Sequence, residues 1–341
     1  MTRLRNLVLG GIAALAIGGA ATSALAEETG TFQNRLNGAT IGLPLGALPP
    51  AGLYTGLETA YLGMLAGGGN GGASVGNQCA LVPGNTHCSV LPAIAQAVPL
   101  LWVPGWNFLG ATYGASVVQA FYNFETCGFG GTNGGCGGGS PISGGGFVLA
   151  NTTFNPITLS WNLGGGWFVS AAFNFMAPDG TRTGPATFTP NPDYWTFEPA
   201  LAISYLGSGW VLSGNFFYDI NSASTGACCA STTITSGNAL YGDLTALWKF
   251  GKWEIGPVGY FEVQTTSDTG PGCPALCGSY QTAAAGGLIG YDFGPVDLQV
   301  WVTDSFVGNN GPQGSGGINV WSRIGFKLWG PPAPAPLVAK N

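Results

Sequence analysis

Long and short connections alternate strictly along this chain, and this alternation constrains the possible fold more than any other feature. About twelve segments of alternating hydrophobicity are separated by connections of two kinds. The short ones are turns of two or three residues: Pro104-Gly105, Leu163-Gly164-Gly165, Gly207-Ser208-Gly209, Gly251-Lys252 and Gly294-Pro295. The long ones are mostly rich in Gly or Cys and cover roughly residues 67–90, 125–145, 178–192, 222–236, 268–278 and 309–317. In an up-and-down chain every long loop then leaves the same end of the molecule, which is typical of β-barrels of the bacterial outer membrane.

The N-terminus has the pattern of a secretory signal peptide. Arg3 and Arg5 precede an apolar run over residues 7–20, and the small residues Ala24-Leu25-Ala26 offer a cleavage site. An N-terminal membrane anchor is the alternative, but the run is short and rich in Gly and Ala. No later apolar run is long enough for a transmembrane helix. We therefore predict that residues 1–26 are removed on export, and that the exported chain spans a membrane as a barrel.

The composition agrees with a wall that faces lipid. Only 7% of the residues are charged, whereas about a quarter is usual, and the hydrophobic fraction of 45% is ordinary. A soluble domain of this length would need more surface charge, but only the lumen and the rims of a barrel need polarity. Without the signal peptide the chain has 15 acids and 7 bases, since two of the 9 bases precede the cleavage site. This acidic balance argues against nucleic-acid binding, which requires a basic face.

A period of two predicts an all-β fold, a single antiparallel transmembrane barrel of about twelve strands with the last strand beside the first. The expected strands are residues 52–66, 91–103, 106–124, 146–161, 166–177, 193–206, 210–221, 237–250, 252–267, 279–292, 296–308 and 318–329. The barrel domain is then 52–329. Residues 27–51 form an N-terminal extension or short plug, and residues 330–341 form a Pro-rich tail. A barrel of this size lies between small filled barrels and open porins, so its lumen either passes a narrow solute or is plugged.

The same alternation predicts which side chains point into the lumen. In 210–221 the apolar residues occupy even positions, whereas Ser213, Asn215 and Asp219 occupy the opposite face. Extended to other strands, this parity turns seven candidate constriction residues inward: Thr196, Glu198, Tyr241, Asp243, Tyr260, Glu262 and Arg323. They form either a weak binding constriction for phenol-like or carboxylate solutes or, more simply, a structural network. In both cases we expect Arg323 to pair with Glu58, Glu198, Asp243 or Glu262, because an unpaired charge is costly there.

Tryptophans collect beside the short turns. The residues concerned are Trp102, Trp106, Trp161, Trp167, Trp210, Trp248, Trp253 and Trp329. Trp prefers the membrane interface, where its ring is half buried and its N–H stays in contact with water. Packing in the core of a soluble β-sandwich does not explain why most of the Trp residues lie at one end. We interpret them as an aromatic girdle.

The eight cysteines all fall in the long connections. Three pairs lie within single loops, Cys79 with Cys88, Cys127 with Cys136 and Cys273 with Cys277, and Cys228 and Cys229 are adjacent. In an exported protein such cysteines indicate disulfide bonds, and we expect local pairing. The adjacent pair is left open as strained, reduced or bonded to another loop. A metal site is disfavoured because His87 is the only histidine, so we predict neither a metal nor a cofactor.

An enzyme is not expected. Outer-membrane hydrolases with a Ser–His pair need a histidine oriented near the strand ends, and His87 lies in a Cys-rich loop. Carboxylate catalysis by Glu198, Asp243 or Glu262 is a formal alternative, but their charge more simply balances basic groups in the lumen. The Gly-rich runs lack the Lys-Ser/Thr ending of a phosphate-binding loop.

Short motifs lie between residues 191 and 296. They are Asn191-Pro192-Asp193-Tyr194-Trp195-Thr196-Phe197-Glu198-Pro199, Ser204-Tyr205-Leu206, Tyr218-Asp219-Ile220-Asn221, Gly251-Lys252-Trp253, Gly256-Pro257-Val258-Gly259-Tyr260 and Gly290-Tyr291-Asp292-Phe293-Gly294-Pro295-Val296. With them, roughly residues 146–329 resemble the transporter-type outer-membrane barrels named for the meta-pathway of phenol degradation. The resemblance implies uptake of aromatic or other hydrophobic growth substrates. The chain departs from that pattern in its Cys-rich loops and in the tail after Trp329.

The sequence therefore predicts an outer-membrane channel or transporter for small hydrophobic or aromatic compounds in a Gram-negative bacterium. The partners expected are outer-membrane lipid, the solute and the outer-membrane assembly machinery. The alternative is a surface-anchored barrel with an adhesion or structural role. Its loops are Gly- and Ser-rich and poor in charge, which favours flexible lids over a binding platform.

Overall fold

A computed structural model describes residues 34–62, 93–124, 146–181, 191–223, 235–270, 281–309 and 318–331. The predicted signal peptide and the tail from residue 332 lie outside these ranges. In the described part no helix is long and apolar enough to cross a membrane.

The predicted disulfide bonds also lie outside the described residues. This holds for all eight candidates: Cys79, Cys88, Cys127, Cys136, Cys228, Cys229, Cys273 and Cys277. The local pairings of Cys79 with Cys88, Cys127 with Cys136 and Cys273 with Cys277 therefore stay predictions, and the state of the adjacent pair stays open.

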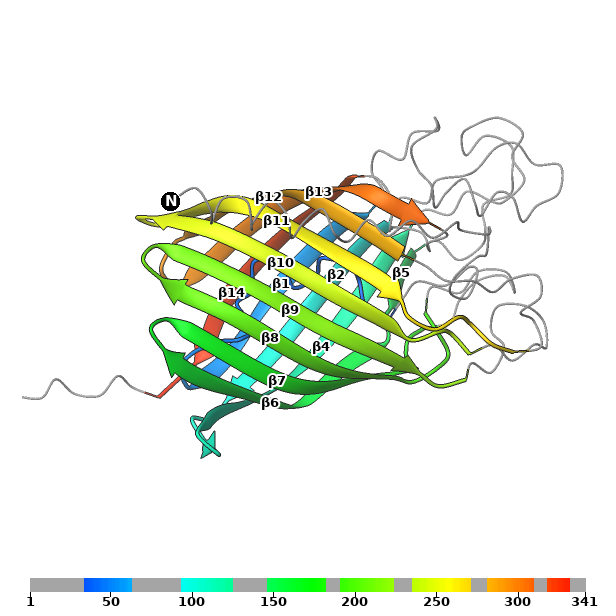
Figure 1. Ribbon diagram of the computed structural model, residues 1–341, viewed down its shortest axis with the longest axis horizontal. Helices are drawn as coiled ribbons and strands as arrows, with labels where there is room; N and C mark the ends of the chain where they lie inside the picture. The colour runs from blue at the N-terminus through cyan, green and yellow to red at the C-terminus, as the bar shows by residue number, and fades with distance from the viewer. Residues whose placement is uncertain are drawn as a thin grey trace, which may run out of the picture.

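Twelve long antiparallel strands form a closed barrel in the described part of the chain (Figure 1). Each strand pairs with the next, and β1 also pairs with β14, so the last strand lies beside the first as predicted. The long strands are β1 (Gly52–Leu62), β2 (Ala93–Val103), β4 (Ala111–Phe124), β6 (Thr152–Gly164), β7 (Trp167–Ala177), β8 (Thr196–Gly207), β9 (Trp210–Asn221), β10 (Ala239–Phe250), β11 (Trp253–Gln264), β12 (Gln281–Asp292), β13 (Val296–Asn309) and β14 (Ile318–Trp329). The predicted twelve-stranded barrel is confirmed.

Two of the expected strands are divided. The segment 106–124 breaks at Leu109 and Gly110, whose φ angles of 51° and 79° are left-handed and end β3 (Asn107–Phe108) before β4 begins. The segment 146–161 breaks between β5 (Gly146–Leu149) and β6, where the side chain of Gln119 donates to the carbonyl of Ala150 at 2.9 Å. Both extra strands pair with β4 and leave the barrel closed.

The short turns gather at one end of the barrel (Figure 1). Between β8 and β9 the turn residues Ser208 and Gly209 both have positive φ, 51° and 79°. Such turns match the twist of the two strands that they join. We orient this end towards the periplasm, and the opposite end, where the long connections attach, towards the outside.

The outer surface is apolar. The even residues of β9 and the odd residues of β11 point away from the lumen, and most of their side chains are apolar. Trp253, Ile255 and Val263 on β11 are exposed, whereas Tyr260 and Glu262 on the same strand are buried. Exposed tryptophans follow the short-turn end as the predicted girdle: Trp102, Trp106, Trp167, Trp210, Trp248, Trp253 and Trp329. An apolar belt with aromatic rims is the surface that a barrel presents to lipid.

Candidate functional site: the barrel interior

Residues 34–50, here called the inner segment, cross the interior of the barrel from its outer end to its periplasmic end. At the outer end Asn34 donates to the hydroxyl of Thr196, the first residue of β8, at 2.7 Å. At the periplasmic end the amide of Leu48 donates to Ser160 at 3.3 Å. The chain then leaves the lumen and enters β1 at Gly52. A polypeptide segment therefore occupies part of the lumen along its length.

The inner segment is a series of turns rather than a strand. The amide of Ile41 donates to the carbonyl of Gly38 at 3.2 Å, and that of Ala47 to Pro44 at 2.9 Å. Gly38 and Gly42 have positive φ values of 84° and 81°. At Gly42 a Cβ atom would also lie 2.9 Å from Leu288 Cδ1, so glycine is required there by conformation and by space. The turns leave many backbone groups free to bond to the wall.

A buried ion pair fixes the outer half of the inner segment. Arg35 donates from two nitrogens to the two carboxylate oxygens of Glu198, which also accepts from Asn174 at 2.5 Å. Glu198 is 0% exposed. The guanidinium of Arg35 lies 3.4 Å from the ring centroid of Phe217. Because paired, hydrogen-bonded charges are expensive to separate in the interior, this contact holds the segment to β8.

Two further acids bind the same half of the segment. Asp243 accepts from the amide of Gly38 at 3.1 Å and from the amide and hydroxyl of Thr40 at 2.9 and 2.6 Å. Glu262 accepts from the side chain of Asn37 at 2.6 Å. Hydrogen bonds to an ionised acceptor are stronger than neutral ones, so both carboxylates anchor the turn between residues 37 and 40.

Arg323 joins three parts of the chain. Its Nε donates to Glu58 on β1, and its terminal nitrogens donate to the carbonyls of Ile41 and Ala39, each at 2.6 Å. It also donates to Gln299 at 2.8 Å and lies 4.7 Å from the ring centroid of Trp301. Arg323 thus faces inward and pairs with Glu58, one of the four acids predicted as its partners. It connects the last strand, the first strand and the inner segment.

Small polar side chains hold the periplasmic half. Thr245 accepts from the amide of Gly42 at 2.9 Å, and Ser160 donates to the carbonyl of Gly46 at 2.7 Å. Other bonds of this kind come from Ser170, Ser204, Ser213 and Asn215. The wall residues that bond to the inner segment in these contacts lie on the arc from β6 to β14. Outside this arc, Asn151, which precedes β6, donates to Asn34, and Tyr54 of β1 donates to the carbonyl of Pro50 at the end of the segment.

The wall formed by β2 and β4 is different. Its inward-facing residues at mid-height are only half buried and mostly apolar: Ala97, Pro99 and Leu101 on β2, and Val118 and Ala120 on β4, with Ser116 of β4 opposite Leu101. By contrast, the inward-facing residues of the arc from β6 to β14, such as Glu198, Asn215 and Thr245, are buried. The lumen is therefore filled on its polar side and accessible along its apolar side.

The seven candidate residues from the sequence all point inward and are buried: Thr196, Glu198, Tyr241, Asp243, Tyr260, Glu262 and Arg323. Five of them bond directly to the inner segment: Thr196, Glu198, Asp243, Glu262 and Arg323. Sequence reasoning missed Arg35, although it is the only Lys or Arg between the predicted cleavage site and Arg182, a signal that could have marked it. No cluster of three metal-ligating side chains occurs among the described residues.

A closed antiparallel barrel with an apolar outer belt, aromatic rims and an occupied polar interior defines an outer-membrane β-barrel protein. The chain belongs to the family described as the putative MetA-pathway of phenol degradation, whose model matches residues 83–320, more than half of its length.

The fold is shared with an outer membrane channel from Pseudomonas putida F1, with a TM-score of 0.63 at 12% identity, over 82% of this chain and 96% of that one. The toluene transporter TodX of P. putida is more distant, with a TM-score of 0.40 at 10% identity over 90% of this chain and 99% of that one. No curated protein sequence matches the chain.

Proposed function

We propose that the protein is a non-enzymatic channel that lets small hydrophobic or aromatic compounds cross the outer membrane. The observation that carries this proposal is the two-sided lumen. The inner segment is bonded to the polar arc, and the apolar, half-buried wall of β2 and β4 remains beside it. The free energy of an apolar solute falls when its surface is removed from water. Contact with this wall therefore favours the passage of apolar solutes.

The charges inside the barrel disfavour anionic solutes. Among the described residues, the acids that face the interior include Glu58, Glu198, Asp219, Asp243, Glu254 and Glu262, against Arg35, Arg323 and, at the periplasmic rim, Lys249. Like charges repel more strongly in a narrow lumen than in water. Moreover, Arg323 already donates to four oxygens. The sequence predicted phenol-like or carboxylate solutes. Binding of carboxylates by Arg323 is therefore the less favoured of these two alternatives.

We further propose that the inner segment, within the predicted plug of residues 27–51, limits the width of the path. The seven inward candidates then act mainly as the structural network that holds this segment, and the constriction lies between the segment and the β2–β4 wall. The family and the barrel fold support a transport role. A surface-anchored adhesion or structural role would depend on the long loops, which lie outside the described residues. Outer-membrane lipid and the assembly machinery are the other partners that we propose.

The path can be tested by filling it. Ala97→Trp places a large side chain on the inner face of β2, and Val98→Trp places the same side chain on the lipid face, because Val98 points outward and is 40% exposed. Both variants would be expressed in a Gram-negative host, and uptake of radiolabelled toluene measured. We expect the inner substitution to reduce barrel-dependent uptake about tenfold or more and the outer one to leave it within about twofold, a difference of at least about 1 kcal/mol. Equal uptake by both folded variants would contradict the proposed path.

A further inference from the structure

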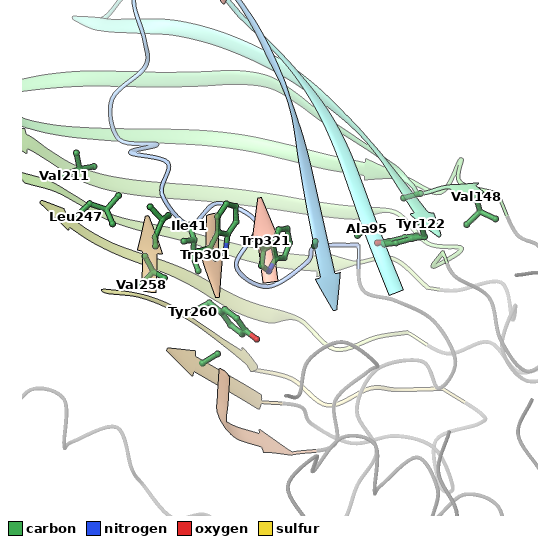
Figure 2. Packing of buried hydrophobic residues seen from close by; sticks show 14 residues of the cluster. Ile41, Ala95, Tyr122, Val148, Val211, Leu247, Val258, Tyr260, Trp301 and Trp321 are labelled. Atoms are coloured by element: carbon green, nitrogen blue, oxygen red, sulfur yellow. The ribbon is translucent and has the colours of Figure 1, made fainter. Parts of the chain in front are cut away.

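Two tryptophans lie inside the barrel, side by side. Trp301 on β13 and Trp321 on β14 are direct neighbours across the sheet, and their rings are stacked with centroids 5.5 Å apart and planes 8° apart. Both are buried (Figure 2). At the same level on the next two strands, the inward-facing side chains are small: Ala60 of β1 and Ala95 of β2. Large aromatic faces therefore lie next to two small apolar side chains, beyond which Tyr122 of β4 follows at the same level.

Three buried polar atoms at this place have no hydrogen-bond partner. They are Nε1 of Trp301, Nε1 of Trp321 and Oγ1 of Thr303, each within the part of the chain that the structure describes. Thr303 lies two residues further along β13, on the outer side of Trp301. A buried indole N–H usually finds an acceptor, and leaving it without one is costly. Unused donors gathered on two adjacent strands indicate that a group from outside the chain completes them.

The chemistry of that group follows from the neighbours. On the periplasmic side of the pair, four of the five N–H groups of Arg323 are used by Glu58, Gln299 and two carbonyls of the inner segment. The interior is acidic, which disfavours an anion, and the indole N–H groups offer no acceptor to a cation. A ligand here must therefore be uncharged, must present a flat apolar face to the rings and must carry a hydrogen-bond acceptor.

The inner segment covers this place. Ile41 is part of the same buried cluster as the two tryptophans (Figure 2). Leu36 and Ala39 pack against this cluster. Apolar contacts of this kind can be exchanged for those of another apolar group, but these side chains supply no acceptor for the indole N–H groups. A ligand that carries an acceptor gains hydrogen bonds that the inner segment does not make.

We propose that Trp301, Trp321 and Thr303 form a binding subsite for an uncharged single-ring aromatic compound that carries a carbonyl or hydroxyl oxygen, bound in exchange for contacts of residues 36–41. The ring packs on the tryptophans and the oxygen accepts from their N–H groups. This subsite deepens the proposed function, on which it rests for the route of the solute, by assigning the class of compound that the lumen retains.

Binding to purified, detergent-solubilised full-length protein tests the subsite. The probes are acetophenone and α-methylstyrene, which has nearly the same shape but no acceptor. In the Trp301→Phe/Trp321→Phe variant, which keeps two aromatic rings but no N–H, we expect acetophenone affinity to fall about tenfold and α-methylstyrene affinity to change less than about twofold. The matched control is Trp210→Phe/Trp248→Phe in the girdle, a pair with centroids 5.0 Å apart, which should change neither affinity.

Several results would overturn the subsite. These are an unchanged acetophenone affinity in the Phe variant, an equal loss for both probes, or a benzoate affinity in the wild type as high as that for acetophenone. Folding is checked by heat-modifiable migration on gels. If the double variant does not fold, Thr303→Val carries the same comparison, with a loss of about threefold expected for acetophenone alone and no selective loss refuting the subsite.

The binding assay also separates this proposal from the proposed function. If cells with the barrel take up toluene and acetophenone no faster than cells without it, but acetophenone binding depends on the Trp pair, the channel function fails and the subsite stands. If uptake depends on the barrel and binding ignores the Trp pair, the subsite fails and the channel function stands.

Discussion

Removing Arg35 should release the outer half of the inner segment. In Arg35→Ala the carboxylate of Glu198 stays in a place that is 0% exposed, with Asn174 as its remaining donor among the contacts described here. The cation above the ring of Phe217 is lost as well. The segment would keep its bonds to Asp243 and Arg323, so we expect partial release rather than loss of the barrel.

The magnitude follows from the burial of the pair. Breaking a buried ion pair by deleting one partner costs about 3–5 kcal/mol. We call the inner segment docked when it is bonded to the wall and released when it is not. If the whole cost destabilises the docked state, the ratio of docked to released segment drops by about two to three and a half orders of magnitude. Glu198→Gln in the Arg35→Ala background removes the unpaired charge, so the double variant should recover much of the docking. The recovery measures the coupling between the two residues.

Planar-bilayer conductance of the purified protein is the assay. We expect the open probability or unit conductance to rise in Arg35→Ala and to return towards the wild-type value in the double variant. The matched control is Lys249→Ala, which breaks the rim pair with Glu254, where the N–O distance is 3.4 Å and the side chains of Lys249 and Glu254 are 56% and 13% exposed. Ion pairs at the surface contribute about 0–1 kcal/mol, and Glu254 keeps the side chain of Gln299 as a donor, so this control should conduct like the wild type. Arg35→Ala conducting like Lys249→Ala would refute the anchoring role.

Two other predictions concern the inner segment and the loops. Gly42→Ala should weaken docking by about 1–2 kcal/mol from the left-handed conformation alone, and more from contact with Leu288, seen as faster amide exchange over residues 36–48. Gly251→Ala, with φ of 62° and open space around its Cβ position, is the control, and equal exchange in both variants would contradict the packing argument. Cys79 should be bonded to Cys88 and Cys127 to Cys136, and mass spectrometry of unreduced peptides that finds four free thiols would refute this.

The sequence predicted the wall of the barrel well because lipid imposes a simple rule on it. Each strand must alternate apolar and polar residues, so parity turned Glu198, Asp243 and Arg323 inward, which is where the structure places them. The division at Leu109 was missed, since a non-glycine residue with positive φ leaves no clear mark in the sequence. The side of Trp301 and Trp321 was fixed by parity too, but their apolar rings in a polar lumen gave no reason to single them out.

The path of the inner segment could not be derived from its residues. It has no period of two or 3.6, because its conformation is set by side chains of the wall that lie far away in sequence. Asp243 is 203 residues from Thr40, and Glu198 is 163 residues from Arg35. Composition suggested an extension or plug, but the partners that hold each turn become visible only when the barrel has brought them together.

Three of the hydrogen bonds of Arg323 also bear on how the barrel assembles. They join residues 265, 282 and 284 positions apart, about the full length of the barrel domain, and such distant contacts form late because loop closure must come first. Until β14 arrives, Glu58 lacks its cation and the carbonyls of Ala39 and Ile41 lack this donor. In a chain that stalls or is truncated before its last strand, the seam, where β1 would pair with β14, therefore stays open. The inner segment lacks its bonds to Arg323 at the same time. One arginine thus makes completion of the seam and ordering of the interior a single event.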